Sequence, residues 1–177
     1  MVYTVRIALY SNTLPYLRNF SKKERIPLPL VIAAFLAEAC TVVGSPWRNI
    51  QAALDGETIW EGIHFIEKQK KLGKIPVGGK FSLIETYVAP RYLANFEEYQ
   101  EITGLNKHHL GTLLLNRELY RNNLRENGLA KHISALVNMS EKRIKEILSK
   151  IRLFEIKEAK AYFREEMKII SKLSKGK

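Results

Sequence analysis

Apolar residues recur every three or four positions along most of this chain, which is the spacing of one buried helix face. The pattern predicts helices over 3–20, 30–43, 46–54 and 57–72, and a long helix beginning at 141. Between them it predicts helical stretches over 81–104 and 105–128, broken by Pro90, Gly104 and Gly128, and a helix that ends near 137. No convincing pair of strands stands out. We therefore predict an all-α fold, a basic helical bundle with a long C-terminal amphipathic helix.

The N-terminal segment leaves an alternative open. Residues 2–7 are rich in β-branched side chains and could form a strand. Leu9, Leu14, Leu17 and Phe20 nevertheless follow helical spacing, with Pro15 as the exception. We interpret 3–20 as a helix.

The clearest helix signals lie in the C-terminal half. Ser140 is placed as an N-cap, and the residues expected on the buried side of the helix after it are Ile144, Ile147, Leu148 and Ile151. In the stretch over 105–128, the residues that can face the core are Leu110, Leu113, Leu114 and Leu119. We expect one domain over 1–177, with a possible subdivision near 73–80 and a frayed tail at 174–177.

The net positive charge of the chain indicates a polyanion as the candidate partner of the predicted helical bundle. The chain has 29 Lys and Arg against 18 Asp and Glu, a formal net charge of +11. Such an excess attracts phosphates, because each neutralised phosphate releases condensed counterions. A merely cationic protein, a ribosomal protein, a membrane-surface protein or a partner of an acidic protein would share this bias.

The candidate contacts are basic residues grouped in the sequence. They are Lys22, Lys23 and Arg25; Lys68, Lys70, Lys71, Lys74 and Lys80; Arg117, Arg121 and Arg125; and Lys142, Arg143 and Lys145. Helices of a bundle could gather the first three groups on one surface that touches phosphates without reading bases. The arginines are favoured because they recur every four residues and pair with phosphate oxygens in two-pronged fashion.

Catalytic and cofactor sites find little support. His108 and His109 are adjacent, so their side chains diverge on a helix and cannot clamp one metal ion. The Gly78–Ser82 stretch lacks the frame of a phosphate-binding loop, although it could meet a nucleic-acid backbone. We predict no enzyme activity, no metal and no cofactor.

The most apolar segment, residues 28–44, is interpreted as a buried core helix that contains Cys40 as a small hydrophobe. Glu38 interrupts it, and it is shorter than the roughly 20 apolar residues of a membrane span. The single cysteine suits a reducing compartment, and the N-terminal residues lack the basic start, long apolar stretch and small-residue cleavage site of a secretory signal, so we expect a cytoplasmic protein without membrane association.

A helix, a short turn and a helix around Ser140 invite comparison with helix-turn-helix DNA readers, since Lys142, Arg143 and Lys145 lie early in the second helix. The first helix is long for that motif and the turn lacks the usual glycine. We therefore favour two antiparallel bundle helices as the explanation of this segment.

The chain resembles the small subunit of type I CRISPR effector (Cascade) complexes. In particular, it is similar to the helical C-terminal part of a large subunit of the I-B or I-D kind. The likeness is carried by the basic helical character, the length, and the stretch His108-His109-Leu110-Gly111-Thr112-Leu113-Leu114-Leu115. The abrupt start of the chain would fit an internal start in a larger gene.

The resemblance implies a non-catalytic subunit present in several copies that contacts the backbone of target or displaced DNA and stabilises the R-loop. Its expected partners are DNA, the crRNA-containing effector complex, other copies of itself, and large and backbone subunits. A helix-turn-helix transcription regulator and a protein-binding helical module, such as a ribosome-associated one, remain as alternatives.

Overall fold

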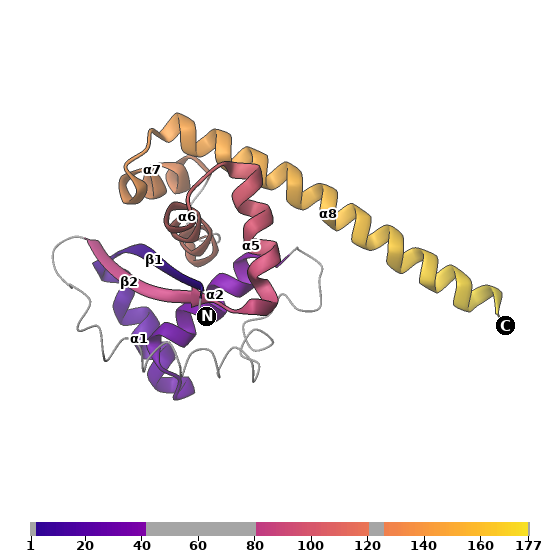
Figure 1. The fold of residues 1–177 in the computed structure, drawn as a ribbon, viewed down its shortest axis with the longest axis horizontal. Coiled ribbons are helices and arrows are strands. Elements are labelled where there is room, and N and C mark those ends of the chain that lie inside the picture. The colour runs from indigo at the N-terminus through magenta and orange to yellow at the C-terminus, as the bar shows by residue number, and fades with distance from the viewer. Residues whose placement is uncertain (1–2, 42–80, 121–125, 177) are drawn as a thin grey trace.

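The computed structural model describes residues 3–41, 81–120 and 126–176, and within these ranges the chain is mostly helical (Figure 1). The elements are β1 (Tyr3–Tyr10), a short 3-10 helix (Ser11–Thr13), α1 (Leu14–Glu24), α2 (Leu28–Ala39), β2 (Phe81–Val88), α5 (Pro90–Thr103), α6 (Lys107–Tyr120), α7 (Glu126–Val137) and α8 (Glu141–Lys175). The predicted helices at 46–54 and 57–72, and the predicted subdivision near 73–80, lie outside the described residues.

Two strands correct the all-α prediction. β1 and β2 pair antiparallel, with Tyr3 opposite Val88 and Tyr10 opposite Phe81. The predicted helix over 3–20 is wrong for 3–10, where buried and more exposed residues alternate as in a half-buried strand. It is right from Leu14 onward, because Pro15 falls in the first turn of α1, where proline is tolerated.

The free edge of β1 is covered by side chains of α6. The backbone N–H of Arg6 donates to Nδ1 of His108 at 3.0 Å, and the N–H of Ala8 donates to Oγ1 of Thr112 at 3.1 Å. The side-chain amide of Asn116 donates to the Ala8 carbonyl at 3.1 Å. These three α6 residues recur every four positions, so one row of the helix satisfies the strand edge that would otherwise be open to pairing.

Gly111 allows this close approach of α6 to β1. A Cβ built on Gly111 would lie 2.7 Å from Cγ1 of Val5 and 3.4 Å from Cγ1 of Ile7. Both strand residues are fully buried. The glycine of the Leu-Gly-Thr stretch is therefore explained by packing of the helix on the strand.

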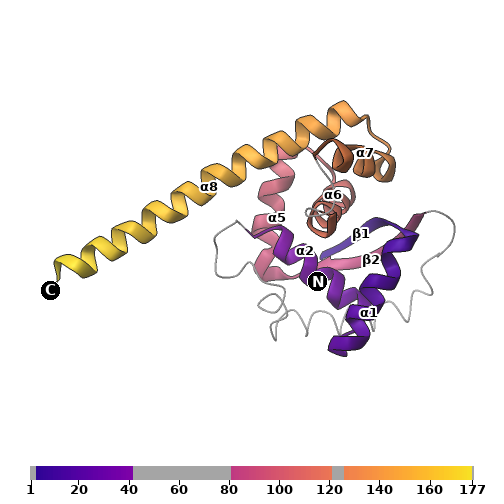
Figure 2. The ribbon, with the colours of Figure 1, turned by 180° about the vertical axis from the view of Figure 1, so that it is seen from behind.

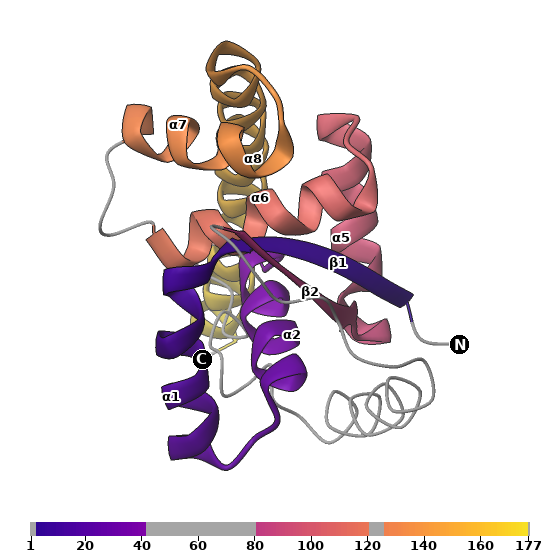
Figure 3. The ribbon, with the colours of Figure 1, turned by 90° about the vertical axis from the view of Figure 1, so that its left-hand side faces the viewer.

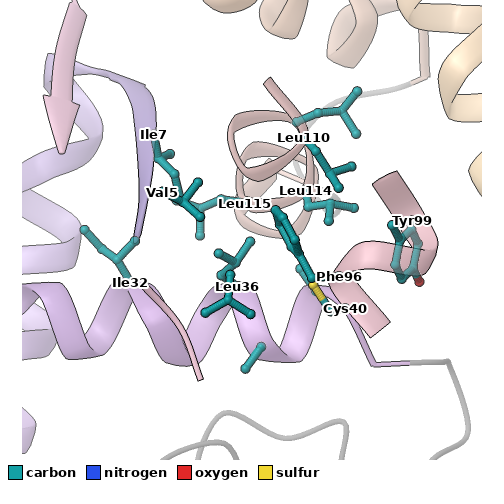
Figure 4. Close-up of a cluster of buried hydrophobic side chains, with 14 of the residues drawn as sticks. Val5, Ile7, Ile32, Leu36, Cys40, Phe96, Tyr99, Leu110, Leu114 and Leu115 are labelled. Atoms are coloured by element: carbon teal, nitrogen blue, oxygen red, sulfur yellow. The ribbon is translucent and has the colours of Figure 1, made fainter. Parts of the chain in front are cut away.

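The core lies where β1, α2, α5 and α6 meet (Figure 4). Side chains labelled there include Ile7 of β1, Leu36 of α2, Phe96 of α5 and Leu114 of α6, all with no more than 1% exposure. Cys40 is buried at the end of α2, as predicted. The observed α2 begins at Leu28, two residues before the predicted start at 30. It ends at Ala39, four residues before the predicted end at 43.

The long C-terminal helix is confirmed. Oγ of Ser140 accepts the backbone N–H of Arg143, and α8 continues for 35 residues to Lys175. All four predicted apolar residues are buried, namely Ile144, Ile147, Leu148 and Ile151. The helix then leaves the body of the molecule, as Figure 1 and Figure 2 show from opposite sides. We call residues 156–175 the α8 arm, because Glu155 is the last buried residue of the helix.

Candidate nucleic-acid interface

Two of the predicted basic groups lie on the surface of the described chain. Lys22 and Lys23 are exposed in the last turn of α1, and Arg25 is exposed just beyond it with a left-handed φ of 55°. At the start of α8, Lys142 and Arg143 are exposed and Lys145 is partly buried. The remaining predicted contacts, except Arg117, lie outside the described residues: Lys68, Lys70, Lys71, Lys74, Lys80, Arg121 and Arg125.

These two surface groups do not share a face. α1 and the start of α8 lie at opposite ends of the body in Figure 1 and in the view turned by 90° (Figure 3). The first group therefore has no described neighbour among the predicted contacts.

Arg117 is buried, which corrects its assignment to a surface stripe. The residue is 8% exposed, and its guanidinium donates to the carboxylate of Glu155 and, at 3.4 Å, to the carbonyl of Ala39. Burial alone would lower the pKa of Arg117, but the attraction of Glu155 outweighs it and the pKa lies above its ordinary value. Arg117 thus joins α6 to α8 and α2 and is not available to a phosphate.

The described part of the chain offers a different and longer basic surface on α8. This helix has eleven Lys and Arg against six Glu, which leaves a net charge of +5. Four of the cations, Arg143, Lys150, Lys157 and Arg164, follow one another at intervals of seven residues. Seven residues are nearly two helical turns, so successive members are displaced by only about 20° around the helix.

Lys168 and Lys175 continue the same line to the end of the helix. We call these six residues the basic stripe: Arg143, Lys150, Lys157, Arg164, Lys168 and Lys175. All six are exposed, and the line from first to last is about 48 Å long at 1.5 Å per residue. The stripe runs along both the packed half of α8 and the arm.

The sides of α8 differ in charge. At about 100° per residue, Glu141, Glu155 and Glu166 fall about 150° or more around the helix from the middle of the stripe, whereas the exposed Glu146 lies within about 30° of it, between Arg143 and Lys150. Ile151 and Glu155, which face the body, also lie well away from it. Glu165 contacts Lys168 at 3.2 Å, but both side chains are largely exposed and such a pair contributes little. The stripe is therefore a solvent-facing cationic surface.

Two of the described histidines, His108 and His132, act as structural groups. Nδ1 of His108 accepts a hydrogen bond from the edge of β1. The pKa of His108 is lowered, first by burial and then by the nearby cations of Lys107 and Arg6. The ring of His132 lies between those of Tyr10 and Tyr120, with centroids 4.2 and 4.3 Å away, and burial lowers its pKa as well. Among the described residues, no group of three or more His, Cys, Asp or Glu is placed to hold a metal ion.

Most of the basic stripe follows a seven-residue interval in the sequence, which a search for cations at four-residue spacing does not find. The prediction included Arg143 because it follows the Ser140 cap, but not the later cations of the same helix. The seven-residue interval that links Arg143 to Arg164 is readable in the sequence. What the sequence alone does not give is that the side they share faces solvent.

Comparison with protein-family models, with curated proteins and with solved structures found no match to this chain. None of the helices in the described part of the chain is both long enough and apolar enough to cross a membrane.

Proposed function

We propose that this protein is a non-catalytic nucleic-acid-binding subunit that contacts the phosphate backbone through α8. The observation that carries this proposal is the basic stripe, six exposed cations in one line along a 35-residue helix. Phosphate contacts of this kind position a protein on nucleic acid and carry no sequence information.

The spacing of the stripe suits a repeating polyanion. Successive members at seven-residue intervals are about 10.5 Å apart along the axis, and long Lys and Arg side chains swing over several ångströms around their backbone positions. Each phosphate neutralised releases counterions, so binding should weaken steeply with salt. Double-stranded and single-stranded nucleic acids both satisfy this requirement.

Within this function we propose a place in a type I CRISPR effector complex. Several copies of the protein would sit beside crRNA-bound backbone and large subunits in the cytoplasm and hold target or displaced DNA. Guide pairing would read the sequence, so the subunit needs backbone affinity alone. A separately recruited nuclease would cut the DNA. The support is the resemblance of the chain together with the α8 stripe.

The test removes three charges from the stripe. The triple variant Lys150→Gln, Lys157→Gln and Arg164→Gln should bind a labelled random-sequence DNA at least about tenfold more weakly in fluorescence anisotropy. Glutamine is a good helix former and all three sites are exposed, so the melting temperature should stay close to that of the wild type.

The matched control removes three exposed cations elsewhere. Arg18→Gln, Lys131→Gln and Arg152→Gln change the net charge equally, and Arg152 lies on α8 about 140° around from the middle of the stripe. Equal losses of affinity in the two variants would mean that net charge alone drives binding. Strong preference for one duplex sequence would instead favour the helix-turn-helix regulator.

A further inference from the structure

A second side of α8 carries a row of exposed apolar side chains. Leu153, Ile156, Phe163, Met167 and Ile170 are between 43% and 69% exposed. With Lys160 they form a line at alternating intervals of three and four residues, which we call the outer seam. This interval is the spacing of a helix that packs against another helix.

The outer seam faces away from the body. Ile151 and Glu155 mark the side of α8 that packs on the rest of the molecule. At about 100° per residue, the seam residues lie between about 100° and 200° around the helix from Ile151. A helix laid on the seam would therefore meet no other part of the described fold.

We propose that the outer seam pairs with the outer seam of a second copy, antiparallel, to form a dimer. The seam intervals read 3-4-3-4-3 and are symmetric about the midpoint between residues 161 and 162. A two-fold axis at that point sets Leu153 against Ile170 of the partner subunit and Ile156 against Met167 of the partner subunit.

At the centre of this arrangement Lys160 meets Phe163 of the partner subunit, and the reverse contact follows from symmetry. An ammonium group near an aromatic face is attracted to it, so the one charged position of the seam is accommodated. Phe163 and Met167 also line a shallow hollow on the helix surface, of the kind that receives a side chain from a facing helix.

The area involved suits a reversible dimer. Full burial of an Ile, Leu, Met or Phe side chain removes about 60–120 Å² of apolar surface. Because these side chains are already nearly half covered in the single chain, five from each copy bury about 350–700 Å², which stays below the roughly 1,200 Å² at the lower end of stable specific interfaces. We therefore expect concentration-dependent association.

Only the antiparallel arrangement places both basic stripes on one face. A two-fold axis perpendicular to the paired helices keeps the same side of each facing the same way, whereas an axis parallel to them turns the two stripes to opposite sides. The antiparallel dimer would thus double the width of the cationic surface.

Sedimentation velocity of the full chain without nucleic acid tests the dimer independently of the proposed function. The wild type should change from monomer to dimer across the micromolar range, and Phe163→Glu with Met167→Glu should weaken dimerisation at least tenfold. The matched control Ile169→Glu with Leu173→Glu alters two equally exposed apolar residues of the arm that lie outside the seam, and should dimerise like the wild type. A wild type that stays monomeric, or a control that loses dimerisation as fully as the seam variant, overturns the proposal.

Disulfide trapping tests the direction of the pairing, since the one native cysteine, Cys40, is buried. A mixture of the Ile156→Cys and Met167→Cys proteins should oxidise to the mixed dimer faster than Ile156→Cys alone oxidises to its own dimer. Faster trapping of Ile156→Cys with itself overturns the antiparallel arrangement.

Discussion

Arg117 and Glu155 form a buried ion pair in which each side chain depends on the other. Replacing Arg117 by Ala leaves the Glu155 carboxylate buried without its cation, so the free energy of unfolding should fall by about 3–5 kcal/mol in urea denaturation. The double variant Arg117→Met and Glu155→Met leaves no uncompensated charge and should unfold within about 2 kcal/mol of the wild type. A single variant as stable as the wild type would contradict the assigned role.

The burial of Arg117 could not be predicted from local sequence spacing. The four-residue spacing of Arg117, Arg121 and Arg125 indicates a shared side of a helix, but spacing does not tell whether that side faces solvent or core. The deciding partner is Glu155, which is 38 residues away along the chain. A buried arginine could be predicted only from that long-range contact.

At the scale of elements, the contact of α6 with β1 makes Gly111 sensitive to a single methyl group. Alanine favours helix over glycine by about 1 kcal/mol. The added Cβ would nevertheless press on the stiff, buried side chain of Val5 at 2.7 Å, so Gly111→Ala should lower the free energy of unfolding by about 1–3 kcal/mol.

Adding Val5→Ala to the Gly111→Ala variant provides the control, because it removes Cγ1 of Val5, the atom that the new Cβ would contact. The combined loss from the two changes should then be smaller than the sum of the two single losses, as measured by a double-mutant cycle. Additive losses would show that Gly111 and Val5 do not meet.

The edge of β1 also makes the fold sensitive to pH. Nδ1 of His108 accepts the Arg6 N–H and must be unprotonated to do so. The pKa values of His108 and His132 are lowered in the folded protein, so below about pH 6.5 the unfolded chain binds more protons than the folded one. Their contribution to stability is therefore present above pH 6.5 and is lost as the pH falls through the folded values.

Thermal unfolding between pH 7.5 and pH 5 measures this effect. The melting temperature of the wild type should fall over this range, and that of the variant His108→Gln with His132→Gln should fall less. An equal decrease in the two proteins would assign the pH dependence to other groups.

At the scale of the whole molecule, the sequence predicts the helices better than the sheet. Helical periodicity and the Ser140 cap lie within short windows and predict the start of α8 and its buried residues correctly. The strand pair joins residues 3–10 to 81–88, so each strand takes its partner from a distant part of the chain, and local spacing misled the interpretation of both. Of the six residues of the basic stripe, only Arg143 was among the contacts predicted from the sequence, and the favoured arginines belong to a different predicted helix.

The distribution of side chains around α8 explains how one helix could serve both the fold and the proposed contacts. The basic stripe, the outer seam and the buried residues of α8 lie on three different sides of one helix, and only the body-facing side is used by the described fold. The two other sides supply the proposed phosphate contact and the proposed dimer contact.

The salt dependence of DNA binding tests the central claim most directly, because its slope counts the phosphates that are neutralised. The logarithm of the association constant should fall linearly with the logarithm of salt concentration for the wild type. For the variant Lys150→Gln, Lys157→Gln and Arg164→Gln, the slope on duplex DNA should be shallower by about 3, at about 0.9 per contact. A variant slope equal to that of the wild type would show that α8 does not touch the phosphate backbone.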